Sequence, residues 1–84
     1  MKYTILIERP AERFIIKLPR PEKERVLRAI AKLPDGGDHK AMQGHAGLFR
    51  LRVGPFRILY TVDNGKLVVR VIDAGNRGDV YKRY

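Results

Sequence analysis

Residues 48–62 alternate apolar and basic side chains on either side of a Gly-Pro pair, and this pattern limits the fold more than any other feature. The first run, Leu48-Phe49-Arg50-Leu51-Arg52-Val53, has the period of two that a half-buried strand requires. The second run, from Phe56 to Val62, follows directly after Gly54-Pro55 and has the same period. The segment therefore predicts an antiparallel hairpin with one apolar face and one basic face.

The register of this hairpin decides where the arginines lie. With a loop of two or four residues, Arg52 lies opposite Arg57 and Arg50 lies opposite Leu59, whereas a three-residue loop would shift the pairing by one. The apolar side chains then share the face expected to meet the core: Phe49, Leu51, Val53, Phe56, Ile58, Tyr60 and Val62. Directly opposed like charges cost a few tenths to about one kcal/mol, so the pair Arg52 and Arg57 is kept more readily where an anion binds it.

A third strand is expected from Lys66 to Ala74. It is joined to the second by residues 63–65, Asp-Asn-Gly, and Asn-Gly is a strong signal for a two-residue type I′ hairpin. In that register Val62 faces Leu67. The C-terminal half is thus predicted to be a three-stranded meander.

The same register places Arg70 opposite Leu59, as a fourth guanidinium on the basic face. Leu59, Val68 and Ile72 interrupt this face with apolar side chains. The face is therefore amphipathic, and it suits a peptide with acidic and apolar residues as well as RNA.

The N-terminal half predicts a short strand at residues 2–8 and then two helices that begin at Pro10 and Pro21. Each helix carries an apolar stripe: Ala11, Phe14, Ile15 and Leu18 in the first, and Val26, Ala29, Ile30 and Leu33 in the second. The order βααβββ predicts an α+β fold, with an N-terminal helical hairpin packed on one face of a twisted antiparallel sheet. Residues 1–84 are expected to form one small domain.

Residues 34–47 contain several glycines and both histidines, and we interpret them as a mobile loop at the edge of the basic face. An unperturbed imidazole titrates near neutrality, but we interpret His39 and His45 as loop residues and not as acid-base groups. The histidines and aspartates lack metal-ligand spacing, so no metal and no cofactor are expected.

Composition narrows the possible partners. The chain has 18 basic and 9 acidic residues, a net charge of +9, and the excess lies mainly in the C-terminal half. A positive electrostatic field of this kind favours nucleic acid, an acidic membrane or an acidic protein as binding partner. No segment is apolar enough to span a bilayer or resembles a secretory signal, and there is no cysteine, so a cytoplasmic protein is expected.

Two segments resemble the RelE/ParE toxin superfamily, and the similarity extends over nearly the whole chain. The first runs from Gly44 to Tyr60 around Leu-Phe-Arg-Leu-Arg-Val-Gly-Pro-Phe-Arg-Ile-Leu-Tyr, and the second from Val69 to Tyr81 with Gly-Asn-Arg-Gly-Asp-Val-Tyr. Members that resemble RelE are ribosome-dependent endoribonucleases that cut messenger RNA in the A site, and a cognate antitoxin wraps and neutralises them. The resemblance thus implies an mRNA interferase toxin of a toxin–antitoxin pair, with the antitoxin, the ribosome and mRNA as partners.

The resemblance also implies five catalytic residues: Arg50, Arg52, Arg57, Arg77 and Tyr81. In-line attack of a ribose 2′-hydroxyl needs charge neutralised on the phosphate, one proton removed and another donated. We expect Arg57 and Arg77 to clamp the phosphate, Arg50 and Arg52 to hold flanking phosphates or the transition state, and Tyr81 to stack on a base or orient the 2′-hydroxyl. Some members carry lysine where this chain has Arg50 and Arg52, and because a guanidinium stays protonated, no proton acceptor is identified.

Further residues are expected to bind RNA or the antitoxin: Arg70, Leu59, Lys82 and Arg83. Three alternatives remain for the basic face. It is an ordinary solvated sheet face, or it belongs to a ParE-like toxin that inhibits DNA gyrase without nuclease activity, or it binds nucleic acid without catalysis. Tyr81 has the alternative of packing the C-terminus.

Overall fold

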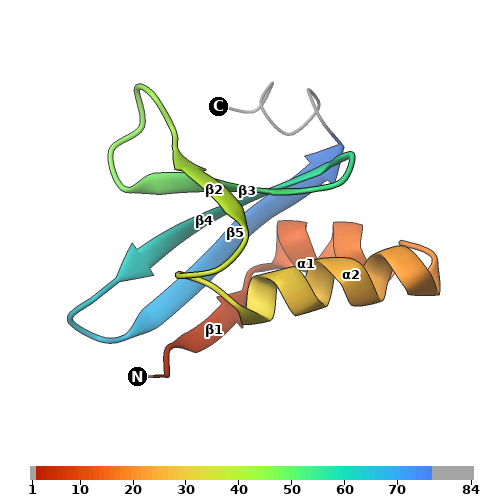
Figure 1. The fold of residues 1–84 in the computed structure, drawn as a ribbon, viewed down its shortest axis with the longest axis horizontal. Helices are drawn as coiled ribbons and strands as arrows, with labels where there is room; N and C mark the ends of the chain where they lie inside the picture. Colours follow the sequence, from red (N-terminus) through yellow and green to blue (C-terminus); the bar gives the residue numbers. More distant parts are fainter. Residues whose placement is uncertain (1, 77–84) are drawn as a thin grey trace.

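Two helices cover one face of a five-stranded sheet in the computed structural model, which describes residues 2–76 (Figure 1). The elements in chain order are β1 (Thr4–Ile7), α1 (Arg9–Ile16), α2 (Arg20–Ala31), β2 (Asp38–Ala41), β3 (Leu48–Val53), β4 (Phe56–Asp63) and β5 (Val68–Asn76). The strand order is β1-β5-β4-β3-β2. The predicted α+β fold is confirmed, with β2 as an additional strand.

The short N-terminal strand lies beside the meander, as predicted. β1 pairs with β5 in parallel, while the other neighbouring pairs are antiparallel, so the sheet is mixed and not wholly antiparallel as predicted. We call the face covered by the helices the inner face and the opposite one the outer face.

Both helices carry a proline in their first turn and bury the predicted stripes. Pro10 and Pro21 lie in the first turns, where a missing backbone N–H costs nothing. The buried or partly buried positions are Ala11, Phe14, Ile15 and Leu18 of the first stripe and Val26, Ala29, Ile30 and Leu33 of the second. None of the helices in residues 2–76 is long and apolar enough to cross a membrane.

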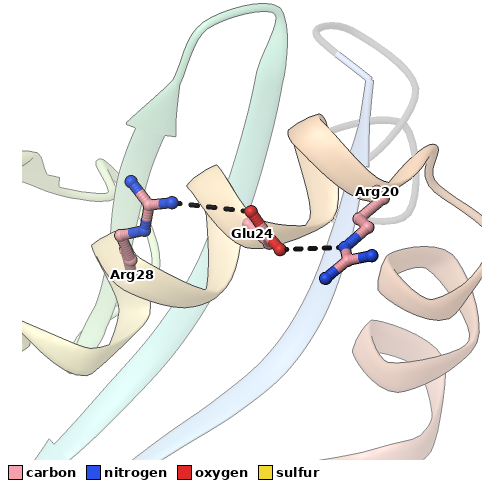
Figure 2. A network of polar contacts seen from close by, with 3 residues as sticks. All are labelled: Arg20, Glu24 and Arg28. Atoms are coloured by element: carbon pink, nitrogen blue, oxygen red, sulfur yellow. Dashed lines mark hydrogen bonds and ion pairs between the residues drawn. The ribbon is translucent and has the colours of Figure 1, made fainter.

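The exposed side of α2 carries a chain of ion pairs, shown in Figure 2. Glu24 Oε1 accepts a hydrogen bond from Arg20 Nε at 3.2 Å, and Glu24 Oε2 lies 3.5 Å from Arg28 Nη2. Both arginine side chains are largely in solvent and that of Glu24 is about half exposed, so each pair contributes only about 0.3–0.5 kcal/mol. These cations are already compensated by their own helix.

The core lies between the helices and the inner face. The strand residues in it include Leu51, Ile58, Tyr60, Val69 and Val71, which have at most 1 % of their surface exposed. The ring of Phe14 meets that of Phe56 edge to face at 5.7 Å, which ties α1 to β4.

The pairing of β3 with β4 follows the predicted register. Val53 lies opposite Phe56, Arg52 opposite Arg57 and Arg50 opposite Leu59. Gly54 adopts a φ of 57°, a left-handed conformation that favours glycine, and with Pro55 it completes a two-residue loop. The predicted division into an apolar inner face and a basic outer face is therefore confirmed for this hairpin.

The predicted register of the third meander strand is wrong. Val62 pairs with Val69, not Leu67, and Arg70 pairs with Thr61, not Leu59. The loop between Asp63 and Val68 has four residues, because Asp63 Oδ1 accepts a hydrogen bond from Lys66 N at 3.0 Å and Leu67 adopts a φ of 55°. The shift is two residues, so Arg70 stays on the outer face.

The prediction of a mobile loop over residues 34–47 is also wrong in part. Asp38–Ala41 forms β2, which pairs antiparallel with β3 at the sheet edge. All four β2 residues are exposed, so the strand has no apolar alternation to reveal it. Main-chain bonds close the loop that follows, including one from Met42 N to Leu48 O of 2.8 Å.

Candidate active site

Three arginines converge on the outer face because of the β3–β4 register. Arg50 and Arg52 are two residues apart on β3, and Arg57 lies opposite Arg52 on β4. Residues two apart on a strand point to the same side. The predicted grouping of these guanidinium groups on one face of the sheet is therefore present in the structure.

The charge of Arg52 is compensated by a residue of the edge strand. Asp38 lies opposite Arg52 in the β2–β3 ladder, and its Oδ2 is 3.6 Å from Arg52 Nε. Both side chains are about half exposed, so solvent screens the pair and its contribution to stability is small. The main effect of the ion pair between Asp38 and Arg52 is to reduce the repulsion between Arg52 and Arg57.

Arg57 is nearly buried, with 4 % of its surface exposed. Its Nη1 donates hydrogen bonds to the backbone oxygens of Gly54 at 3.0 Å and Phe56 at 2.9 Å. The guanidinium is thereby fixed against the β3–β4 loop. Arg57 has a structural role in that loop, and its other N–H groups are the ones left to meet a ligand.

An open groove of 390 Å³ lies between β2 and β3 on the outer side, and we call it the β2–β3 groove. Its lining residues are Lys40, Ala41, Met42, Gln43, Arg50 and Arg52. Lys40 lies opposite Arg50 in the ladder. Within residues 2–76 neither Lys40 nor Arg50 forms an ion pair, which distinguishes them from Arg52. The groove thus offers two uncompensated cations and one compensated cation.

Lys40 was missed by the sequence analysis because β2 was missed. The signal available was the spacing of Asp38 and Lys40, two residues apart and complementary to Arg52 and Arg50 across a hairpin. Four polar residues carry too little pattern to predict a strand.

Arg70 lies apart from this group. It is on β5, and its Nη1 donates a hydrogen bond to Glu8 Oε2 at 3.1 Å across the β1 edge. Both side chains are close to half exposed. Arg70 is therefore available at the surface, but Glu8 compensates its charge.

Between Arg70 and the β2–β3 groove, the outer face carries a small apolar cluster. Leu48 and Leu59 are buried, and Met42 and Ile72 pack against them. Of the three residues predicted to interrupt the basic face, Leu59 and Ile72 belong to this cluster and Val68 does not. Leu59 itself has 0 % of its surface exposed, so in this structure it supports the face from beneath.

The histidines do not lie in the groove. His39 is opposite Leu51, whose side chain is in the inner core, and it lines a separate cavity with Tyr3, Asp35 and Tyr60. His39 is in a strand and His45 is in the following loop, so the prediction of loop residues holds for His45 alone. No group of metal-ligating side chains occurs within residues 2–76.

Four predicted site residues, Arg77, Tyr81, Lys82 and Arg83, lie outside the described residues. The described part of β5 ends at Asn76, opposite Phe56, and Gly75 lies opposite Arg57. The chain therefore leaves the described region beside the β3–β4 loop.

With this geometry established, comparison with known proteins identifies the family. Residues 5–81 match the family model of the ParE toxin of type II toxin–antitoxin systems. The chain belongs to this toxin family. The resemblance to the RelE/ParE superfamily drawn from the sequence is confirmed.

Individual relatives of this toxin agree with the family. Toxin RelG of Mycobacterium tuberculosis is 29 % identical over 91 residues, covering 99 % of this chain and all of the relative. The solved toxin–antitoxin complex RelBE2 of the same organism contains a chain that is 26 % identical, with a TM-score of 0.77, covering 92 % of this chain and 100 % of that one.

The isolated RelE toxin of E. coli shares the fold. Its TM-score is 0.73 at 22 % identity, and the match covers 96 % of this chain and 93 % of the E. coli chain. The predicted fold class is therefore supported by solved structures as well as by the strand order.

Proposed function

We propose that this toxin is a ribosome-dependent endoribonuclease that cuts messenger RNA in the A site. The observation that carries the proposal is the grouping of Arg50, Arg52 and Arg57 on one sheet face, beside an open groove. Membership of the toxin family and the likeness to toxins named RelE support it. Fixed cationic donors are what a phosphate needs when charge develops on its oxygens in the transition state.

The reaction is attack of a ribose 2′-hydroxyl on the adjacent phosphate. Arg57, held by two backbone oxygens, supplies a preorganised donor, and Arg77 completes the clamp on the phosphate. Arg50 and Arg52 hold flanking phosphates or the charge of the transition state. Tyr81 stacks on a base or orients the 2′-hydroxyl. The roles of Arg77 and Tyr81 derive from the sequence resemblance.

Positioning supplies much of the acceleration in this proposal. A guanidinium stays protonated and cannot accept the proton of the 2′-hydroxyl at neutral pH. Holding the nucleophile in line with the phosphate lowers the barrier without a strong base, and the ribosome fixes the mRNA in that geometry. This accounts for the dependence on the ribosome.

A cognate antitoxin is the second partner in the proposal. Solved relatives include RelB–RelE complexes from Mycobacterium tuberculosis, Pyrococcus horikoshii and E. coli. The outer face of this toxin combines exposed cations with apolar surface, so a peptide with acidic and apolar residues fits it. Arg70, Lys82 and Arg83 supply cationic contacts, and Leu59 underlies the apolar part. Occupation of this face blocks access of RNA to Arg50 and Arg52.

The test is cleavage of mRNA programmed into ribosomes, read by primer extension, with free mRNA as a parallel substrate. Arg50→Ala is the most informative variant, because Arg50 makes no ion pair within residues 2–76 and its loss should spare the fold. We expect A-site cuts from the wild type and a rate about 10²-fold lower from Arg50→Ala. Arg77→Ala should reduce cleavage similarly.

Arg28→Ala is the matched control, because Arg28 lies on the exposed side of α2, away from the arginines of the outer face. This variant should cut at the wild-type rate. Full cleavage by a folded Arg50→Ala variant, or no cuts by the wild type, would contradict the proposal.

A second candidate function is inhibition of DNA gyrase without nuclease activity. The observation behind this second candidate is one that weighs against the nuclease: Arg57 is only 4 % exposed, and two backbone oxygens occupy its Nη1. A phosphate clamp needs that guanidinium to be reachable. Inhibited DNA supercoiling together with intact mRNA on the ribosome would replace the nuclease with this function.

A further inference from the structure

The proposed cleavage needs a proton for the leaving 5′ oxygen, and none of the three grouped arginines gives one up readily. A guanidinium is an effective charge donor but holds its protons too tightly to transfer one near neutral pH. A lysine ammonium is the cation that exchanges a proton more readily. The question is therefore whether the outer face carries such a group beside the arginines.

We propose that Lys40 is a further catalytic residue, whose ammonium group protonates the leaving 5′ oxygen. This inference rests on the proposed nuclease function. It goes beyond the five residues that the sequence resemblance implies, because Lys40 comes from the edge strand β2 and from no motif of the resemblance.

The register of β2 places Lys40 in the groove. Asp38 and Lys40 are two residues apart, and Asp38 reaches Arg52 on the outer side, so Lys40 points to that side as well. Directly opposed side chains have Cβ atoms about 4.5–5.5 Å apart, which puts Lys40 next to Arg50. Lys40 also lines the β2–β3 groove with Arg50 and Arg52.

The charges on β2 and β3 divide the groove into two parts. Asp38 compensates Arg52, whereas Lys40 and Arg50 face each other with no ion pair within residues 2–76. Like charges opposed across strands repel, and an anion between them removes that cost. A phosphate is therefore drawn to the Lys40–Arg50 end of the groove, where the ammonium meets its oxygens.

Other proton-transfer groups are placed less suitably. His39 is opposite Leu51 and lines the cavity with Tyr3 and Asp35, away from the groove. The Asp38 carboxylate is paired with Arg52. His45 lies in the loop after β2, and it does not line the groove. Lys40 is the groove-lining residue with a transferable proton among those the structure describes.

The step balances without any further reactant. The 2′ oxygen forms a bond to phosphorus, and the bond from phosphorus to the 5′ oxygen breaks with its electron pair on that oxygen. The Lys40 ammonium gives the 5′ oxygen a proton, which yields a 5′-hydroxyl and a 2′,3′-cyclic phosphate. The 2′-hydroxyl proton passes to water, and Lys40 regains a proton from solvent.

The experiment compares two mRNAs on the ribosome, one natural and one with sulfur in place of the 5′ bridging oxygen at the scissile position. A thiolate leaves without a proton, so this substrate does not need the acid. The variants are Lys40→Arg, which keeps the charge, and Lys40→Gln, which removes it. Lys32→Gln, at the residue that follows the last residue of α2, is the control for the loss of one charge. Circular dichroism and thermal melting establish that each is folded.

We expect both Lys40 variants to cut natural mRNA about 10²-fold more slowly than the wild type. On the sulfur substrate, Lys40→Arg should cut within a few-fold of the wild type. The Lys32→Gln variant should match the wild type on both substrates.

Equal loss on both substrates would overturn the inference, because Lys40 would then act only in binding. Unchanged cleavage of natural mRNA by Lys40→Gln would also overturn the inference. In that case, cleavage by the wild type would still support the proposed function. No cleavage of either mRNA by the wild type would overturn the proposed function, and the inference with it.

Discussion

Asp38 of β2 and Arg52 of β3 form an ion pair of 3.6 Å between Oδ2 and Nε, on the same side of the sheet as Lys40 and Arg50. The pair joins the edge strand β2 to the three arginines grouped on the outer face, Arg50, Arg52 and Arg57. It also places a carboxylate at the border of a groove that we propose to hold phosphate. In the proposed complex with RNA, the Asp38 carboxylate would oppose binding while it orients Arg52.

Asp38→Asn should raise the affinity for RNA. Removal of the Asp38 carboxylate charge frees Arg52 to contact a phosphate. One added phosphate contact steepens the dependence of log affinity on log salt concentration by about 0.7 for single strands. Stability should change by less than about 1 kcal/mol, because both side chains are about half exposed. Fluorescence anisotropy of a labelled RNA oligonucleotide over a salt series measures the slope.

Asp35→Asn is the control for Asp38→Asn. It removes the same charge a few residues away, but Asp35 lines the cavity with His39 and not the groove. Equal slopes for the two variants would show that the gain comes from net charge alone.

Arg57→Ala should destabilise the protein, unlike Arg50→Ala. Arg57 is 4 % exposed and donates to two backbone oxygens of the β3–β4 loop, and leaving such acceptors unpaired costs about 1–3 kcal/mol. Arg50→Ala should stay within about 0.5 kcal/mol of the wild type. Urea denaturation of both variants gives the comparison. If the two unfold at the same urea concentration, the structural role of Arg57 is wrong.

The β3–β4 hairpin was predictable because its physical signal is strong. Apolar and basic residues alternate without interruption on both sides of Gly54-Pro55, and a shift by one residue would expose the whole apolar set. The helices were predictable for a similar reason, since prolines mark their starts and apolar stripes mark their buried sides.

Two features depended on interactions that sequence patterns do not carry. A single hydrogen bond, donated by the backbone N–H of Lys66 to Asp63 Oδ1, accompanies a four-residue turn, and the register of β5 moves by two. The strand β2 is entirely exposed, so pairing with β3, and not burial, defines it. Because β2 was missed, its contributions to the candidate site, Asp38 and Lys40, were missed too.

The small apolar cluster on the outer face leads to a prediction about stability. Leu59→Ala should lower the free energy of unfolding by about 2–5 kcal/mol, because Leu59 is fully buried against Leu48, Met42 and Ile72. Leu27→Ala makes the same chemical change on α2, where Leu27 is 40 % exposed, and should cost less than about 1 kcal/mol. Chemical denaturation distinguishes the two. A small loss for Leu59→Ala would mean that the outer cluster contributes little to the fold.

Tyr60 should make stability fall at alkaline pH. Burial raises the pKa of its hydroxyl above the ordinary value of 10.0, and its ring stacks on Phe49 at 5.6 Å between ring centroids. A group whose folded pKa is raised contributes stability in full below its unfolded pKa, and that stability is lost as pH rises through the folded pKa. The unfolding free energy should therefore decline above pH 10, by at most about 1.4 kcal/mol per pH unit from this site.

Tyr60→Phe removes this titration, so the difference in unfolding free energy between wild type and variant should be constant below pH 10 and shrink above it. Urea denaturation at a series of pH values across 10 measures the difference. Ile58→Val is the control, because Ile58 lies in the same strand and core and carries no titrating group, so its difference from the wild type should stay constant. Parallel stability curves for the wild type and Tyr60→Phe at every pH would show that the buried hydroxyl does not ionise differently in the folded and unfolded chains.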